Sequence, residues 1–166
     1  MKSAALVLTG VWLGALLASW VAATVNFRTV DRVLGAGARP ELAQKLDPVP
    51  PEARRQALRH LASEINRWSF RWWSIAQVVL AAIVVFLAWR QEGAARYLIL
   101  AALAIVLAQV ALVRPIVELG RSIDFVPRPL PPDVGRRFGL LHAAFVGTDL
   151  LKAALLAAAA ALLGRR

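Results

Sequence analysis

Three side chains that could bind a polar ligand or hold a proton stand in an otherwise apolar segment near the end of the sequence. His142, Asp149 and Lys152 lie within residues 138–164, where Asp149 and Lys152 are the only charged residues. In a helix, His142 and Asp149 are two turns apart on one face, and Lys152 follows Asp149 closely enough to pair with its carboxylate. An imidazole and a carboxylate at this spacing can transfer a proton or bind a ligand. The spacing therefore predicts a polar seam along one long helix.

The segment that carries this seam is one of four apolar segments that are long enough to cross a membrane. The other three contain a charge-free stretch each, at residues 3–27, 72–89 and 97–113, and 59% of the 166 residues are hydrophobic. A hydrocarbon core of about 30 Å requires roughly 20 helical residues. The sequence therefore predicts an all-α, integral membrane four-helix bundle that forms a single domain over residues 1–166. The predicted spans are residues 4–27, 70–90, 94–119 and 134–163.

The first apolar segment has a second interpretation. Lys2, the apolar residues after it and the small residues Ala22 and Ala23 resemble a secretory signal peptide. However, the apolar stretch is longer than the usual signal core of about 7–15 residues, and it contains Trp12 and Trp20. We therefore predict a membrane span here, with cleavage of this segment as the alternative.

The basic residues are distributed unevenly between the two ends of the predicted spans. Fourteen of the 20 Lys and Arg residues lie in or next to the connections at residues 28–69 and 120–133, and five lie at the opposite ends of the spans. Basic connections stay preferentially in the cytoplasm, so both connections are predicted to be cytoplasmic and both termini external. The location that fits is the bacterial inner membrane. The net charge of +10 then reflects loops that face anionic lipids, and we expect no nucleic-acid partner.

The first connection contains a second helical pattern. Its first part, "ARPELAQKLDPVPPE", is interrupted by prolines, which disfavour the interior of a helix. After these prolines, Ala57, Leu61, Ile65, Trp68 and Trp72 follow at steps of three or four residues, which is one face of a helix, and arginines occupy much of the rest. We predict a basic amphipathic cytoplasmic helix that is continuous with the second span. It lies on the inner leaflet or extends from the membrane and packs on its neighbours.

Other polar side chains on the predicted spans could complete the seam. Asn26, Gln77, Gln109 and His142 each lie two to six residues inside the basic residue that ends their span on the cytoplasmic side. We expect them to converge in a hydrogen-bonded layer at this shallow depth, with Asp149 and Lys152 deeper. A charge near the bilayer midplane costs at least about 2.5–3.5 kcal/mol, so Asp149 must face the bundle interior. Two interpretations stay open: contacts that fix the register of the helices, or a proton, ion or ligand site.

A second group of polar residues is expected at the cytoplasmic mouth of the bundle. Its members are Glu64, Arg67, Arg71, Arg114, Glu118 and Arg137. Arg114 and Glu118 are four residues apart and can pair on the third span. We interpret this group as a solvated rim that faces lipid headgroups, with an anion site as the alternative.

This sequence lacks the residues that several kinds of chemistry require. There is no cysteine, and Met1 is the only methionine, which excludes disulfides and thiolate or thioether metal sites. A haem held by two histidines within the bundle is excluded, because His142 is the only histidine on a predicted span and His60 lies in a connection. No P-loop, dinucleotide fingerprint, zinc-protease pair or nucleophile elbow occurs. We expect no cofactor and no metal.

Three stretches of this sequence are similar to a known type of protein: "VWLGALL" with the later Phe27, "RPIVELG", and "RRFGLLHAAFVGTDLLK". Together they resemble the transmembrane protein 205-like domain family of four-span bacterial membrane proteins. The residues that align are Trp12, Gly14, Phe27, Pro115, Phe138 and His142. None of them has an assigned chemical role in that family, so the resemblance implies fold and location and no activity.

These observations predict a membrane protein without evident catalytic activity. We expect an accessory subunit or a small binding module whose partners are the lipid bilayer and either further copies of itself or a larger membrane complex. The alternative is a small carrier or proton-relay protein that uses His142, Asp149 and Lys152. A third alternative is a protein that binds a redox cofactor of the haem type.

Overall fold

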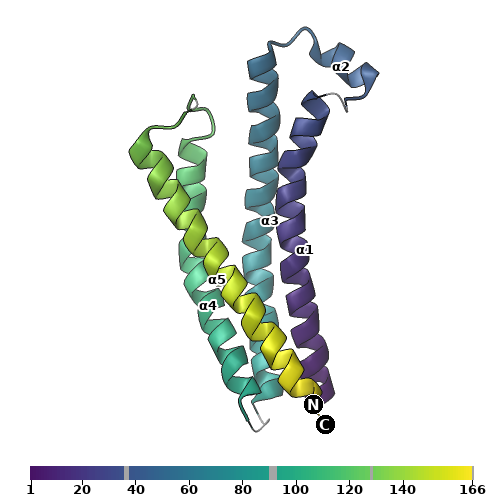
Figure 1. Ribbon diagram of the computed structural model, residues 1–166, viewed down its shortest axis with the longest axis vertical. Helices are drawn as coiled ribbons and strands as arrows, with labels where there is room; N and C mark the ends of the chain where they lie inside the picture. The colour runs from purple at the N-terminus through teal and green to yellow at the C-terminus, as the bar shows by residue number, and fades with distance from the viewer. Residues whose placement is uncertain (36–37, 90–92, 128, 166) are drawn as a thin grey trace.

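The computed structural model describes residues 1–35, 38–89, 93–127 and 129–165, and these residues form helices and turns without a strand (Figure 1). The helices are α1 (Lys2–Leu34), α2 (Pro40–Leu46), α3 (Pro51–Ala88), α4 (Ala95–Ser122) and α5 (Pro132–Gly164). All but α2 are long and apolar enough to cross a membrane. The predicted all-α class and the four long apolar helices are therefore confirmed. The predicted end of the second span, Arg90, lies outside the described residues.

Proline marks the beginning of three helices. Pro40, Pro51 and Pro132 each occupy the first helical position of α2, α3 and α5. Proline suits this position because its missing N–H group would have no partner in the helix, and its φ angle is already helical. The short helix α2 was not predicted, because a helix was expected only after Pro51 and the stretch before it was interpreted as interrupted by prolines.

The four long helices pack in a closed order, each against the next: α1 against α3, α3 against α4, α4 against α5, and α5 against α1. Both termini lie at one end, called the terminal end here, and α2 lies at the opposite end, called the α2 end (Figure 1). Near the terminal end the helices enclose a core of fully buried side chains, which includes Trp12, Ile99 and Leu156 together with several alanines. Small residues allow close approach of helix backbones. Toward the α2 end, the pair α1–α3 and the pair α4–α5 diverge (Figure 1).

The basic amphipathic segment is part of α3, which runs without interruption for 38 residues. Its predicted continuity with the second span is therefore confirmed. The predicted apolar face is not packed on a neighbour, however, since Leu61, Ile65 and Trp68 are all exposed. Ala62 and Asn66 are buried in this segment instead. Asn66 contacts α1 through two hydrogen bonds, because it accepts one from Asn26 and donates one to the Ala23 carbonyl.

The C-terminal part of α4 differs from the prediction at Gly120. The third span was predicted to end at residue 119, before this glycine, but α4 continues to Ser122, and Gly120 is buried within it. A Cβ atom at Gly120 would lie 3.5 Å from the guanidinium nitrogen Nη2 of Arg67. Gly120 therefore lies in van der Waals range of the Arg67 guanidinium from α3, at a distance that a Cβ atom would also tolerate.

Candidate functional site

The buried centre of the site is a group of charged and polar side chains midway along α4 and α5. The Nζ atom of Lys152 donates hydrogen bonds to Asp149 Oδ1 at 2.7 Å and to Gln109 Oε1 at 2.6 Å. The Nε2 atom of Gln109 donates to the same Asp149 oxygen at 2.8 Å and to Thr148 Oγ1 at 2.9 Å. Lys152 is fully buried, and Asp149 and Gln109 are nearly so. The Gln109 amide thus contacts both members of the ion pair.

A third helix contributes to this group through Trp20 of α1. Its indole Nε1 donates a hydrogen bond of 2.9 Å to Oδ2, the second carboxylate oxygen of Asp149. Both oxygens of Asp149 therefore accept hydrogen bonds from partners on other helices, in addition to the bond from Lys152. We call Trp20, Gln109, Thr148, Asp149 and Lys152 the Asp149 cluster. It joins α1, α4 and α5.

The predicted pairing of Asp149 with Lys152 is confirmed, but the predicted single layer of Asn26, Gln77, Gln109 and His142 is wrong. Gln109 belongs to the Asp149 cluster because side chains on a helix lean toward its N-terminus, which for α4 is the direction of Asp149. Asn26 instead donates to Asn66 Oδ1 at 2.5 Å, between α1 and α3. His142 stacks on Phe138, with ring centroids 6.0 Å apart.

Gln77 remains apart from these contacts. Its side chain is buried on α3, and its Oε1 atom has no hydrogen-bond partner among the described residues. It lies on α3, which contributes no side chain to the Asp149 cluster. The structure therefore separates the predicted polar residues into the Asp149 cluster, the Asn26–Asn66 pair, His142 and Gln77.

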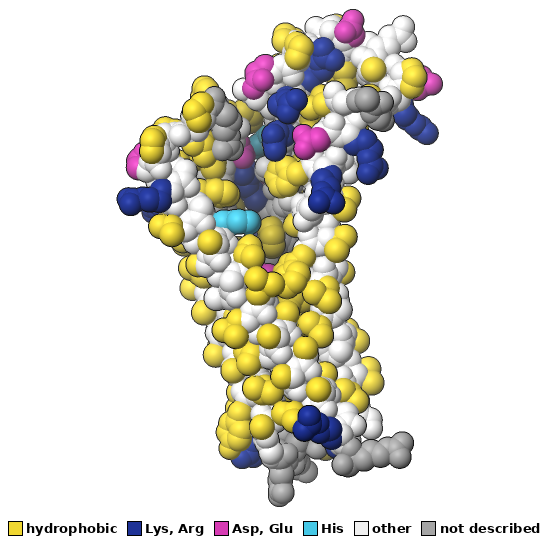
Figure 2. Space-filling model, in the orientation of Figure 1, with side chains coloured by type: hydrophobic (Ala, Val, Ile, Leu, Met, Phe, Trp, Pro, Cys, Tyr) yellow, Lys and Arg dark blue, Asp and Glu magenta, His cyan; other side chains and the backbone are white. Residues whose placement is uncertain are grey.

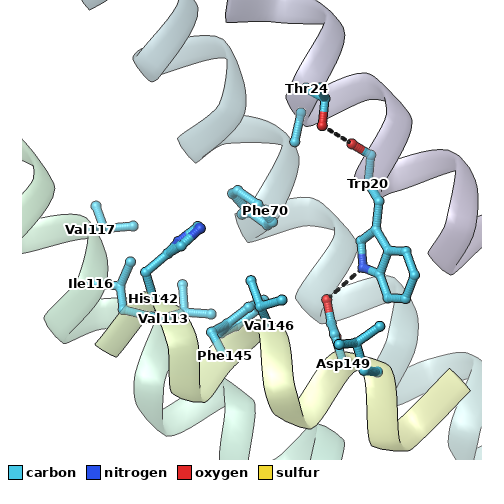
Figure 3. Close-up of a pocket in the computed structure, with 12 residues that line it drawn as sticks. Trp20, Thr24, Phe70, Val113, Ile116, Val117, His142, Phe145, Val146 and Asp149 are labelled. Carbon is cyan, nitrogen blue, oxygen red and sulfur yellow. Dashed lines mark hydrogen bonds between the residues drawn. The ribbon is translucent and has the colours of Figure 1, made fainter. Parts of the chain in front are cut away.

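An apolar cavity of about 350 Å³ adjoins the Asp149 cluster. All four long helices contribute to its lining, which is mostly aliphatic and aromatic. Figure 3 shows His142 and Asp149 at opposite ends of this cavity, with Phe70 and Phe145 between them. No hydrogen bond within the described residues joins His142 to Asp149. The cavity is thus a hydrophobic space with one polar group at each end.

A second, more polar cavity of about 610 Å³ lies on the α2 side of the first, and His142 lines both. Its polar lining comes mainly from the N-terminal part of α3, including Arg55, Arg59 and His60, and its apolar lining includes Phe27 and Phe138. Figure 2 shows the corresponding hollow between the two diverging helix pairs, where basic, acidic and histidine side chains gather above a hydrophobic belt. We refer to the two spaces as the apolar cavity and the polar cavity.

A network of charged side chains holds α3 to the end of α4 beside the polar cavity. Arg67 donates two hydrogen bonds to the Asp124 carboxylate, at 2.6 and 2.8 Å, and one to Glu64 at 2.5 Å. His60 Nδ1 lies 2.9 Å from Asp124, and Arg121 donates to Glu64 at 3.2 Å. We call these five residues the Arg67 network. Ligand atoms of His60, Glu64 and Asp124 lie within 4.8 Å of one another, but arginines already neutralise both carboxylates.

The Arg67 network lowers the pKa of both of its carboxyl groups. Burial by itself would raise the pKa of Asp124, but hydrogen bonds from Arg67 and His60 outweigh it, so that the pKa lies below its ordinary value. Hydrogen bonds from Arg121 and Arg67 lower the pKa of Glu64 to about 2. Both groups are therefore ionised at neutral pH and bind protons less readily in the folded protein than in the unfolded chain.

This difference predicts a loss of stability in acid. A carboxyl group with a lowered pKa stabilises the folded state above its ordinary pKa of about 4, and this contribution disappears as the pH falls through the folded-state value. We expect the thermal unfolding midpoint in detergent to fall between about pH 4.5 and pH 2, and the double variant Glu64→Gln/Asp124→Asn to show a flatter dependence. Glu118→Gln, at an exposed carboxyl group, is the control. An unchanged slope in the double variant would contradict the assignment.

The remaining residues of the predicted mouth do not join the Arg67 network. Arg114 pairs with Glu118 at 2.7 Å, as predicted, and both side chains are largely exposed. Arg71 and Arg114 line a groove between α3 and α4, together with Arg67 and Glu64. Arg137 is exposed on α5. Only Glu64 and Arg67 of the six predicted mouth residues therefore belong to the network beside the polar cavity.

The sequence analysis did not identify several residues of the site. Trp20 was noted only as unusual in a signal peptide, although an indole N–H within an apolar span needs an acceptor and could have indicated a partner for Asp149. His60, Arg121 and Asp124 were not assigned to a site, because the contacts between them join positions about 60 residues apart in the sequence. No local sequence pattern predicts such a contact.

Comparison with known proteins adds no relative: no family model, curated protein or solved structure matches this chain. The resemblance to the transmembrane protein 205-like domain family stays a prediction.

Proposed function

We propose that this protein is a multi-pass protein of the bacterial inner membrane that binds an apolar or amphipathic small molecule between its helices, without catalysing a reaction. Four long apolar helices support the membrane location. The observation that carries the binding function is the apolar cavity of about 350 Å³ that all four of these helices line. Its size lies within the usual range for ligand sites of about 300–1,000 Å³.

The chemistry of the cavity fits a binding site. Ligand sites are mostly apolar and contain a few polar groups in fixed positions, and this cavity has Asp149 and Trp20 at one end and His142 at the other. Asp149 is held by bonds to Trp20, Gln109 and Lys152, so its position is fixed before a ligand arrives. Pre-organisation of this kind reduces the entropic cost of binding.

The geometry favours binding over a proton relay. A relay through the predicted seam would need a path from His142 to Asp149, and the apolar cavity separates them (Figure 3). Both carboxylate oxygens of Asp149 are also already engaged, by Lys152 and Gln109 on one side and by Trp20 on the other. We therefore assign the Asp149 cluster a positioning role beside the ligand.

Photolabelling tests the proposed binding site. The purified protein in phosphatidylcholine nanodiscs is irradiated with dodecanol that carries a diazirine in its chain, and labelled residues are mapped by mass spectrometry. We expect labelling at Phe70 and Phe145, which line the cavity, and loss of this labelling in Ala23→Trp, where a large side chain fills the space. Val21→Trp, at a position that is 62% exposed on the same helix, is the matched control. Equal labelling in both variants would overturn the proposal.

The orientation in the membrane has its own test. Most basic residues lie toward the α2 end, so we propose that this end is cytoplasmic and that both termini are external. A reporter that fluoresces only in the cytoplasm is expected to be dark when it is fused after Arg166 and bright when it is inserted between Leu46 and Pro51. The reverse pattern would contradict the assignment.

A further inference from the structure

We infer that the ligand is an amphiphile with an anionic headgroup, a phosphate or a carboxylate, whose chain occupies the apolar cavity and whose headgroup lies in the polar cavity beside Arg55 and Arg59. This inference rests on the proposed function and names the class of ligand for the same site. Three features of the described residues carry it: the junction of the cavities, the charge of the polar cavity, and its position relative to the apolar belt.

The two cavities share one lining residue. His142 lines both, and the aromatic side chains of Phe27 and Phe138 belong to the polar cavity on its α2 side. A molecule that extends past His142 passes from an aliphatic and aromatic surface to one whose polar groups are guanidinium, imidazole, amide, hydroxyl and carboxylate groups. Only an amphiphile matches both surfaces, because burial of an unpaired polar headgroup in the apolar cavity would be costly.

The polar cavity contains two guanidinium groups that are available to an anion. Arg67 is already occupied by Asp124 and Glu64, whereas Arg55 and Arg59 form no ion pair within the described residues. These two arginines are four residues apart on α3, so their side chains share a face, where like charges destabilise a helix. An anionic group between them removes this repulsion and accepts the forked hydrogen bonds for which arginine is suited.

The polar cavity also contains an acidic residue, Glu52, which forms no ion pair with Arg55 or Arg59 among the described residues. Glu52 lines the polar cavity, and its recorded partner is Gln56, which donates to Glu52 Oε1 at 3.4 Å. Asp124, the other acidic residue of the lining, is held by Arg67 and His60. The groups left for a ligand are therefore predominantly basic.

The position of the polar cavity fits a headgroup. Arg59 lines the polar cavity and Phe70 lines the apolar cavity, and the two residues are about 16 Å apart along α3 at 1.5 Å per residue. Phe70 lies beside the apolar stretch of α3, and Arg59 lies beyond it toward the basic α2 end. A molecule with its charge at Arg59 and its chain beside Phe70 is thus oriented like a lipid of the cytoplasmic leaflet.

Competition with the photoactivatable dodecanol tests the headgroup. Three unlabelled competitors of equal chain length are compared in phosphatidylcholine nanodiscs: dodecyl phosphate, dodecanoate and dodecanol. We expect at least one of the two anions to displace the label at concentrations tenfold or more below that of dodecanol. The stronger anion identifies the headgroup as a phosphate, as in a lipid phosphate, or as a carboxylate, as in a fatty acid.

The matching variants separate this inference from the proposed function. In Arg55→Gln/Arg59→Gln, the advantage of the anions is expected to disappear while displacement by dodecanol is unchanged. Arg136→Gln, at an exposed position on α5 outside both cavities, is the control and is expected to retain the advantage. Equal potency of all three competitors in the unmodified protein would overturn the inference and leave the binding site in place. Failure of every competitor to displace the label would overturn both.

Discussion

Replacement of Lys152 by methionine is expected to lower the free energy of unfolding by about 3–5 kcal/mol, the cost of leaving one member of a buried ion pair without its partner. Lys152 is fully buried and contacts both Asp149 and Gln109. Methionine has a similar length and no charge, so the variant removes the ammonium group without leaving a large hole. Equilibrium unfolding in mixed micelles, followed by circular dichroism, measures the difference.

The double variant Asp149→Leu/Lys152→Met distinguishes the loss of the charge pair from a general disturbance of packing. Replacement of a whole buried ion pair by apolar residues is often nearly neutral, so the double variant is expected to be considerably more stable than Lys152→Met alone. Its remaining deficit would come from Trp20, which loses its acceptor, and from Gln109, which keeps Thr148 but loses Asp149 as acceptor and Lys152 as donor. A double variant that is less stable than Lys152→Met would contradict the assignment of Asp149 as an ionised partner.

Replacement of Arg67 by methionine is the second large effect expected, at about 2–3 kcal/mol for the loss of charged hydrogen bonds. The Arg67 side chain is 11% exposed and its partner Asp124 is 8% exposed, so water replaces the lost bonds poorly. The variant leaves Asp124 with His60 and leaves Glu64 with Arg121. Thermal unfolding and limited proteolysis of the α4–α5 connection measure the effect.

The matched control for Arg67 lies at another ion pair between an arginine and a glutamate. Arg114 pairs with Glu118, but the two side chains are 86% and 63% exposed. Exposed pairs contribute about 0–1 kcal/mol, so Arg114→Met is expected to have little effect on stability. Equal destabilisation by Arg67→Met and Arg114→Met would show that the Arg67 network does not hold α3 to α4.

The sequence was sufficient to predict the four long helices and one contact of the site. Charge-free stretches of the right length indicated the four long helices, because length and hydropathy are local properties. The spacing of Asp149 and Lys152 indicated their pairing, since residues three apart meet on any helix. The same reasoning correctly paired Arg114 with Glu118.

Contacts between helices could not be predicted in the same way. The prediction grouped Gln109 with Asn26 because both lie at a similar depth in the membrane. In the structure the Gln109 side chain leans toward the N-terminus of its helix and therefore contacts Asp149. Trp20 and Asp124 acquire their roles from partners on other helices, which depend on how the helices cross. The third span was predicted to end before Gly120 because glycine is common at helix ends, whereas in the structure Gly120 is buried within α4.

An experimental structure of the protein in nanodiscs of its native lipids tests the central claim most directly. The claim is that the helices enclose a site for one hydrocarbon chain. We expect elongated density that begins beside Trp20 and Asp149, passes His142 and ends near Arg59 in the polar cavity. A structure in which α1 and α5 close on each other, so that Trp20 and Phe145 fill this space and no density remains between them, would contradict it.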